Sequence, residues 1–149
     1  MTMEAYAFCA RPIKSIEDWQ ASIDALGFDL RLRSTRDLAD HRGHLPALWR
    51  GREAGFEFGA CAFAELAETY DDIDLGGPWP YAYAFYFAAL PSCVGRWLAL
   101  AGCLTLTEGV AFDPQEGRIL RPGEAARYAQ DTENEVDRIE SGEVGRTPS

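Results

Sequence analysis

The stretch YAYAFYFAALPSCVGRWLALAG, residues 81–102, predicts one strand followed directly by one helix. Its first part alternates in the period of two that is typical of a strand over 81–89. One face carries the rings of Tyr81, Tyr83, Phe85 and Phe87. The other face is mostly alanine, and small residues there would let a helix approach the sheet closely. Pro91 and Ser92 then favour a helix start, and apolar residues recur every three or four positions. They are Val94, Trp97, Leu98 and Ala101.

The beginning of the chain repeats this order of strand and helix. Residues 3–10 are small or apolar on both faces, which predicts a central strand that ends at Pro12. Ser15 is placed as an N-cap, with acidic residues in the first turn where the helix dipole favours them. The spacing of the apolar residues predicts a helix over 15–26, with Gly27 as its stop.

Between these two units the pattern indicates strands and turns. Residues 28–33 alternate apolar and charged side chains, as a half-exposed strand does. Residues 40–44 indicate a polar loop. Two further strands, 45–50 and 55–63, are joined around Gly51–Gly55, which predicts a hairpin.

The remaining segments are shorter or more polar. The pattern predicts a short helix or loop over 62–70, a glycine- and proline-rich loop over 71–80, a strand over 109–113 and a last helix over 124–139. We expect one domain over 1–140 and a mobile polar tail over 141–149.

This order of elements contains two βαβ-like halves. It predicts an α+β fold, namely a ferredoxin-like sandwich with an inserted hairpin and a C-terminal helix. An α+β fold of another topology is the alternative.

The charge of the chain narrows the function classes. There are 24 acidic residues against 14 Lys and Arg, a formal net charge of −10. A field of that sign repels nucleic acid and anionic membranes and attracts basic partners. No uncharged apolar run reaches the ~18 residues of a membrane span. The start lacks the basic region of a secretory signal and the four cysteines are widely spaced, so we expect a cytoplasmic protein with reduced thiols.

Much of the acidic excess lies in two clusters. The first is Glu65, Glu68, Asp71, Asp72 and Asp74, and residues 53–95 contain no Lys or Arg. It is open to four interpretations: a divalent-cation site, although the EF-hand order fails; a catalytic acid/base pair; a docking patch for a basic protein; or a solvated loop. The second cluster is Asp131, Glu133, Glu135, Asp137, Glu140 and Glu143, which is typical of a solvated helix end and less often of a partner site.

The aromatic face of 81–89 has two interpretations besides nucleic-acid stacking, which the charge disfavours. The rings either pack in the core or line a pocket with Trp49 and Trp79 near its rim. Arg50 and Arg52, at the expected hairpin tip, either hold an anionic ligand or pair with Glu53 or the acidic loop.

Metal and catalytic motifs are weak. His41 and His44, near Asp37 and Asp40, do not make a zinc pattern. No nucleophile elbow or phosphate-binding loop is present. We therefore predict no metal, no cofactor and no catalytic residues, and a binding role is favoured over an enzyme.

In size, charge and lack of motifs the chain resembles the immunity proteins of bacterial toxin systems. That resemblance implies a protein that binds a basic partner, its acids mimicking phosphates if the partner is a nuclease. The expected binding residues are Glu65, Glu68, Asp71, Asp72, Asp74, Trp49, Trp79, Tyr81, Arg50 and Arg52. Two alternatives stay open: a small-molecule binder or enzyme with an aromatic pocket, and a homo-oligomer, most simply a homodimer.

Overall fold

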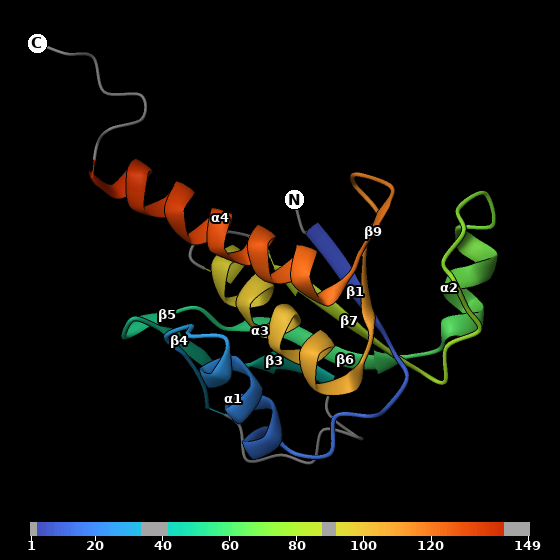
Figure 1. Cartoon of the computed structure of the whole chain (residues 1–149), viewed down its shortest axis with the longest axis horizontal. Coiled ribbons are helices and arrows are strands. Elements are labelled where there is room, and N and C mark those ends of the chain that lie inside the picture. The colour runs from blue at the N-terminus through green and yellow to red at the C-terminus, as the bar shows by residue number, and fades with distance from the viewer. Residues whose placement is uncertain (1–2, 34–41, 88–91, 142–149) are drawn as a thin grey trace, which may run out of the picture.

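The fold is mixed α+β, with helices packed on antiparallel sheets (Figure 1). The structure is a computed structural model that describes residues 3–33, 42–87 and 92–141. Its helices are α1 (Ile16–Ala25), α2 (Phe63–Thr69), α3 (Ser92–Thr107) and α4 (Pro122–Ser141). The α+β class expected from the sequence is confirmed. Of the expected tail, only Ser141 is described, and it ends α4.

Two sheets carry these helices. The larger has six strands in the order β3 (Arg42–Leu45), β6 (Phe56–Cys61), β7 (Tyr81–Phe87), β1 (Met3–Cys9), β8 (Val110–Asp113) and β9 (Arg118–Leu120). Each neighbouring pair is antiparallel. The smaller sheet has the order β2 (Leu30–Leu32), β4 (Ala47–Trp49) and β5 (Arg52–Glu53).

The expected hairpin is present as a long bent ribbon over residues 42–61. Its base, β3 with β6, belongs to the large sheet, and its end, β4 with β5, belongs to the small one. At the tip Arg50 and Gly51 have φ of 52° and 78°. Two successive residues with positive φ make the type I′ turn that suits a two-residue hairpin. The polar loop expected over 40–44 is wrong where the structure describes it, because Arg42 to Leu45 form β3.

The strand expected over 28–33 does not join the large sheet. Instead β2 pairs with β4, and β6 takes the place beside β7. Leu30 and Leu32 are buried in the core. The Gln20 side chain of α1 donates to Leu30 O and accepts from Leu32 N, both at 2.7 Å. These bonds satisfy backbone groups of β2 that a further strand would otherwise pair with.

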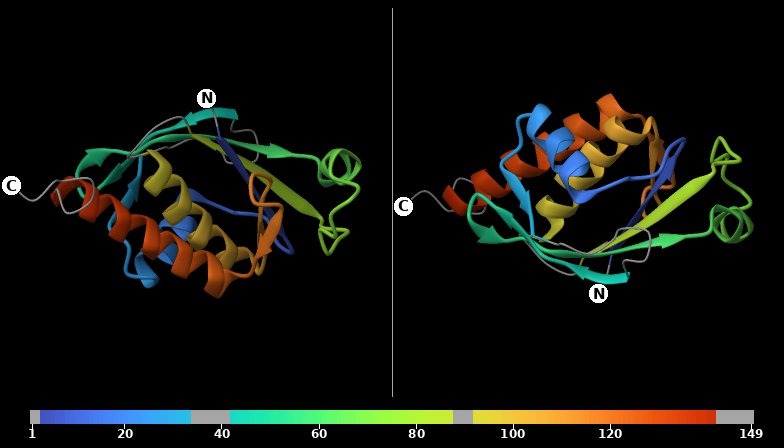
Figure 2. Two further views of the ribbon diagram at one scale, coloured as in Figure 1. Left: turned by 90° about the horizontal axis from the view of Figure 1, so that it is seen from above. Right: turned by 90° about the horizontal axis from the view of Figure 1, so that it is seen from below.

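The main core lies between the large sheet and α1, α3 and α4, which occupy one side of it (Figure 2). On that side small and large residues face each other across β1 and β7, as Ala5 opposite Phe85 and Ala7 opposite Tyr83. The Trp19 indole is fully buried against the rings of Phe56, Phe58 and Phe85, and its nitrogen donates to Ala99 O at 2.8 Å. Tyr83 and Phe85 are therefore core residues. The expectation that a helix packs on the alanine face of β7 is wrong for α1 and α3, which pack on the aromatic face.

Local signals in the sequence place the helix ends. Ser15 is the N-cap of α1, and its hydroxyl accepts from Asp18 N at 3.1 Å. Inside α3, a Cβ at Gly95 would lie 2.2 Å from Ala54 O. Because Gly95 has no side chain, α3 packs directly against the hairpin ribbon at Ala54.

The opposite side of the sheet carries a second, smaller core. Its buried members are Tyr6, Phe8, Leu75, Ala82, Ala84 and Phe112. Half-buried residues of α2 and the following loop pack over them, among them Phe63, Leu66, Tyr70 and Trp79. This second core attaches the segment that bears the first acidic cluster.

Candidate functional site

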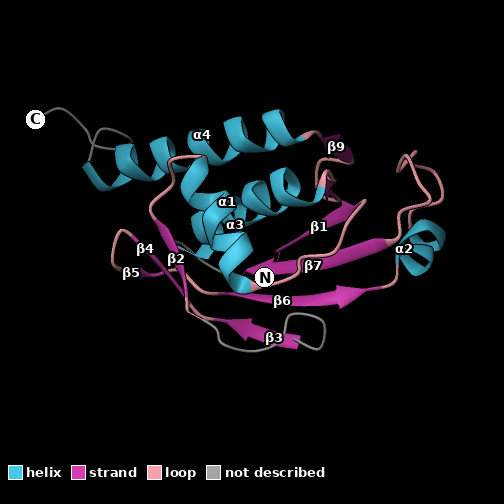
Figure 3. Cartoon of the chain, turned by 60° about the horizontal axis from the view of Figure 1, so that its bottom comes forward, coloured by secondary structure: helices cyan, strands magenta, loops and turns pink. Residues whose placement is uncertain are grey.

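The first acidic cluster lies on a projecting part of the molecule. We call residues 65–74 the acidic segment; it comprises most of α2 and the start of the loop that leads to β7. This part extends past the ends of β6 and β7 (Figure 3). Glu65, Glu68, Asp71, Asp72 and Asp74 are all exposed. The carboxylates therefore point into solvent, where another molecule can reach them.

The five carboxylates have no cationic partner in the part of the chain that the structure describes. The ion pairs found there all use other acids: Glu53, Glu108, Glu133, Glu135, Asp137 and Glu140. Asp74 does accept from Gly76 N at 2.9 Å, which shapes its own loop. Since no described Arg or His neutralises the segment, its negative field is directed outward.

The acidic segment is held by aromatic contacts beneath it. Phe63 packs edge-on against Phe8, with ring centres 5.0 Å apart. Tyr70 packs edge-on against Phe112 at 4.9 Å. These contacts attach the acidic segment to the large sheet.

Two of the predicted aromatic residues lie at this same end of the molecule. Trp79 is half-buried, and its indole nitrogen donates to Leu75 O at 2.9 Å. Tyr81 is 41% exposed, which makes it one of two large apolar side chains found exposed in the described ranges. The structure thus brings Trp79 and Tyr81 to the end that carries the acidic segment.

The other three predicted residues lie at the opposite end, on the hairpin tip (Figure 1). Trp49 is fully buried, and its indole nitrogen donates to Glu133 Oε2 at 2.7 Å. The guanidinium groups of Arg50 and Arg52 lie over the Trp49 ring, at 4.6 and 5.6 Å from its centre. The expectation that Trp49 borders an open site is therefore wrong.

The two tip arginines pair with α4. Arg50 contacts Asp137 at 2.5 Å and Glu133 at 3.6 Å, and Arg52 contacts Glu140 at 2.6 Å. The Asp137 hydrogen bond holds the pKa of Arg50 above its usual value. The sequence left two alternatives for these arginines, an anionic ligand or pairing with Glu53 or the acidic loop. The second alternative is wrong, because their partners lie on α4. The pocket expected among Tyr81, Tyr83 and Trp49 is not formed, because the last two are buried in the main core.

The second acidic cluster is consequently part of the fold. Glu133, Asp137 and Glu140 hold the hairpin tip, and Glu135 pairs with Arg138 on the same helix. Asp131 is exposed, and Glu143 lies outside the described residues. The two acidic clusters therefore differ in their ion pairs. Most described carboxylates of the second cluster pair with an arginine of the same molecule, and those of the first cluster have no described cationic partner.

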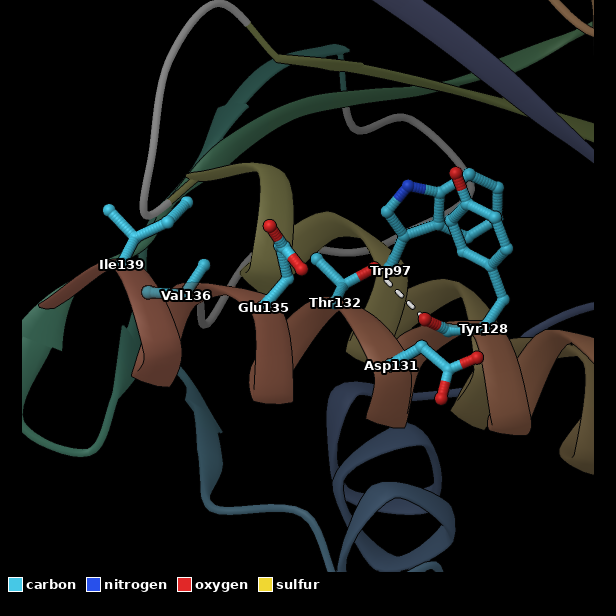
Figure 4. A pocket seen from close by; sticks show the side chains of 7 residues that line it. All are labelled: Trp97, Tyr128, Asp131, Thr132, Glu135, Val136 and Ile139. Carbon is cyan, nitrogen blue, oxygen red and sulfur yellow. Dashed lines mark hydrogen bonds between the residues drawn. The ribbon is translucent and has the colours of Figure 1, made fainter. Parts of the chain in front are cut away.

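A groove on α3 and α4 was not foreseen from the sequence (Figure 4). It has a volume of about 420 Å³ and is lined by Trp97, Tyr128, Asp131, Thr132, Glu135, Val136 and Ile139. Six of these residues lie along one helix at spacings of one, three and four, a helical periodicity that the sequence does show. Ile139 is 45% exposed at its end.

The described residues hold no group of three His, Cys, Asp or Glu side chains that could bind a metal ion. Three of the polar residues of the His41–His44 region, Asp37, Asp40 and His41, lie outside those residues. Within the same ranges, no helix has both the length and the apolar character to cross a bilayer.

Comparison with known proteins gives no further guide. No protein family, curated protein or solved structure matches this chain.

Proposed function

We propose that this protein is a binding module whose acidic segment docks a basic protein partner. The observation that carries the proposal is the contrast between the two acidic clusters. The carboxylates of α4 are engaged with Arg50, Arg52 and Arg138, while those of residues 65–74 are exposed without a described cationic partner. An exposed surface of one sign speeds association with a partner of the other sign.

The aromatic residues beside the segment suit such a surface. Trp79 and Tyr81 offer large, stiff side chains with a polar atom, which are common anchors at the centre of protein interfaces. Tyr81 is available at 41% exposure. The interface would therefore combine steering by charge with one apolar contact at the first residue of β7.

At the level of fold, we assign the core of this module to the ferredoxin-like type. The elements β1, α1, β6, β7, α3 and β8 follow in that order, and the strands lie as β6-β7-β1-β8, all antiparallel. Relative to the sequence expectation, β6 replaces the 28–33 strand in the first half. The small sheet, β3, β9 and α4 are additions to that core.

A partner of the toxin-nuclease type fits this proposal. An immunity-type inhibitor of a nuclease must place negative charge where the enzyme binds phosphates, and five exposed carboxylates over ten residues supply it. The acidic segment would then act as a substitute for the nucleic-acid backbone. Of the alternatives, the aromatic pocket lacks two of its expected rings, which are buried in the main core. Self-association of the chain is opposed by its net charge of −10.

Mapping the binding surface tests the proposal. The probe is an oligoarginine peptide titrated into the isotope-labelled protein at low ionic strength, followed by the backbone amide signals. We expect the largest shifts over residues 63–81 and their loss at high salt, since exposed charges are screened. Shifts centred instead on α1 or on α4 would show that the acidic segment is an ordinary solvated surface.

A further inference from the structure

Two thiols meet inside the main core, where β1 packs against α3. Cys9 is the last residue of β1, and the alternation along that strand turns its side chain toward the helices. Cys103 lies in the second half of α3 and belongs to the same core. Both residues are fully buried, and both are free thiols. The fold therefore brings together two cysteines that are far apart in the chain.

Backbone contacts hold the end of β1 against the end of α3. Just after the strand, Arg11 N donates to Thr107 O of the helix at 3.2 Å. Just after the helix, a Cβ at Gly109 would lie 3.2 Å from Cys9 Cα. Thr107 is one helical turn beyond Cys103, and its hydroxyl donates to Cys103 O at 2.8 Å. Cys9 therefore lies beside the helical turn that begins at Cys103.

The two thiols contact each other and differ in acidity. A hydrogen bond from the Cys103 thiol is the main cause that holds the pKa of Cys9 below its usual value, although burial acts in the other direction. Burial raises the pKa of Cys103. Because the thiolate and not the thiol is the nucleophile, Cys9 is the sulfur that attacks an oxidant, and Cys103 stays protonated beside it.

We infer that Cys9 and Cys103 form an oxidation site, at which a peroxide converts the two thiols into a disulfide that joins β1 to α3. The Cys9 thiolate attacks one oxygen of hydrogen peroxide, the O–O bond breaks, and a sulfenic acid and a hydroxide form. The hydroxide takes up the proton that Cys9 released. The Cys103 sulfur then attacks the Cys9 sulfur, and the displaced hydroxide leaves with the Cys103 proton as a second water. The two thiols lose two electrons, which reduce the peroxide.

The place of the pair in the fold determines which oxidant can react. Cys9 is followed by the exposed residues Ala10 and Arg11, and Cys103 is one turn from the helix end. The ends of elements open locally more readily than their middles. Hydrogen peroxide is scarcely larger than water, so a small opening admits it, whereas a bulky disulfide needs a wide one. Cys61 packs with the second core, on the other side of the sheet, and cannot form this link.

The disulfide would act on the stability of the fold, so the inference is independent of the docking proposal. The link closes a loop that runs from β1 to α3 and contains the whole hairpin ribbon. A cross-link restricts the unfolded chain, and its stabilising effect is larger for a long loop. The oxidised protein should therefore unfold at a temperature higher by about 5 °C or more, and dithiothreitol should reverse this rise.

The test treats the native protein with hydrogen peroxide, blocks the remaining thiols with N-ethylmaleimide in urea, and maps the peptides without reduction. We expect one linked pair, made of the peptides that contain Cys9 and Cys103, which separates after dithiothreitol. Cys61→Ser is the matched control and should form the same link at the same rate. Cys103→Ser should form no link and should show no rise in unfolding temperature.

A link through any other cysteine, or oxidation of Cys9 to a sulfinic acid without a link, would overturn the inference. A link between Cys9 and Cys103 that forms only when urea accompanies the peroxide would also overturn it, because the folded contact would then play no part. The peptide map is measured on the native sequence, so its outcome stands even where a serine variant does not fold. The oligoarginine map reports on residues 63–81 and is unaffected by either result.

Discussion

The indole nitrogen of Trp49 donates to Glu133 Oε2 at 2.7 Å, and both residues are buried. This bond joins the tip of the hairpin ribbon to the middle of α4, two parts of the chain that are 84 residues apart. Arg50 covers the same carboxylate at 3.6 Å. Acidic residues of α4 therefore help to hold the tip of the hairpin ribbon against this helix.

Removing the Glu133 carboxylate should destabilise the fold. Glu133→Leu leaves the buried Trp49 N–H without its acceptor and is expected to lower the free energy of unfolding by about 2 kcal/mol. Glu140→Leu is the matched control, because that residue pairs with Arg52 at an exposed site and should cost less than about 1 kcal/mol. Urea unfolding of both variants measures the difference. Glu133→Gln keeps an oxygen acceptor and should recover part of the loss; equal costs at 133 and 140 would contradict the account.

The close approach of α3 to the hairpin ribbon predicts a large effect of one methyl group. Gly95→Ala would place its Cβ 2.2 Å from Ala54 O, so the backbone must shift, at about 2–3 kcal/mol. Gly123→Ala, in the first turn of α4, meets nothing within 4 Å and should be neutral or stabilising by up to about 1 kcal/mol. Thermal unfolding compares the two. A tolerated Gly95→Ala would mean that the layers are not in contact there.

The buried phenol of Tyr83 predicts a loss of stability at high pH. Burial raises its pKa from 10.0 to about 12, although the Ile13 N–H, which donates to its oxygen at 3.0 Å, acts in the other direction. Between pH 10 and 12 the unfolded chain loses this proton while the folded chain keeps it. The contribution of Tyr83 is therefore complete below pH 10 and is lost as pH rises through 12, a change on the order of 2–3 kcal/mol.

Urea unfolding at a series of alkaline pH values measures this slope. Tyr83→Phe should be less stable than the native chain at neutral pH, because Ile13 N–H loses its acceptor, and should show a flatter decline above pH 10. A slope unchanged by the substitution would assign the alkaline transition to other groups.

The thiols should differ in accessibility. Cys9 and Cys103 are fully buried between β1 and α3, and burial raises the pKa of Cys103. Cys61, at the end of β6, is half-buried. Alkylation followed by peptide mapping should therefore label Cys61 in the native protein and reach Cys9 and Cys103 only when urea is added. Labelling of Cys9 or Cys103 as fast as Cys61 would show that the sheet–helix layer opens readily.

Local features of the fold could be read from the sequence because they depend on near neighbours. The Ser15 cap, the apolar stripe of α3 and the turn at Gly51 are each set by a few adjacent residues. The pairing of β2 with β4 in place of the large sheet depends instead on distant contacts, including the bonds to Gln20. Periodicity shows that a strand exists but does not say which strand it pairs with.

The candidate site likewise depends on contacts between residues that are far apart in the chain. In sequence the two acidic clusters look alike, since each has five or more carboxylates and few cations. Only the fold brings Arg50 and Arg52 to α4 and leaves residues 65–74 exposed.

The association rate of a basic probe tests the central claim most directly. Glu68→Gln, Asp71→Asn, Asp72→Asn and Asp74→Asn together remove four charges from the acidic segment. The control removes four charges from exposed acids elsewhere: Glu17→Gln, Asp24→Asn, Glu116→Gln and Asp131→Asn. Both variants have the same net charge, so only position distinguishes them. With labelled oligoarginine in stopped flow at low salt, we expect the segment variant to associate about tenfold more slowly than the control variant. Equal rates for the two variants would contradict the docking role of the acidic segment.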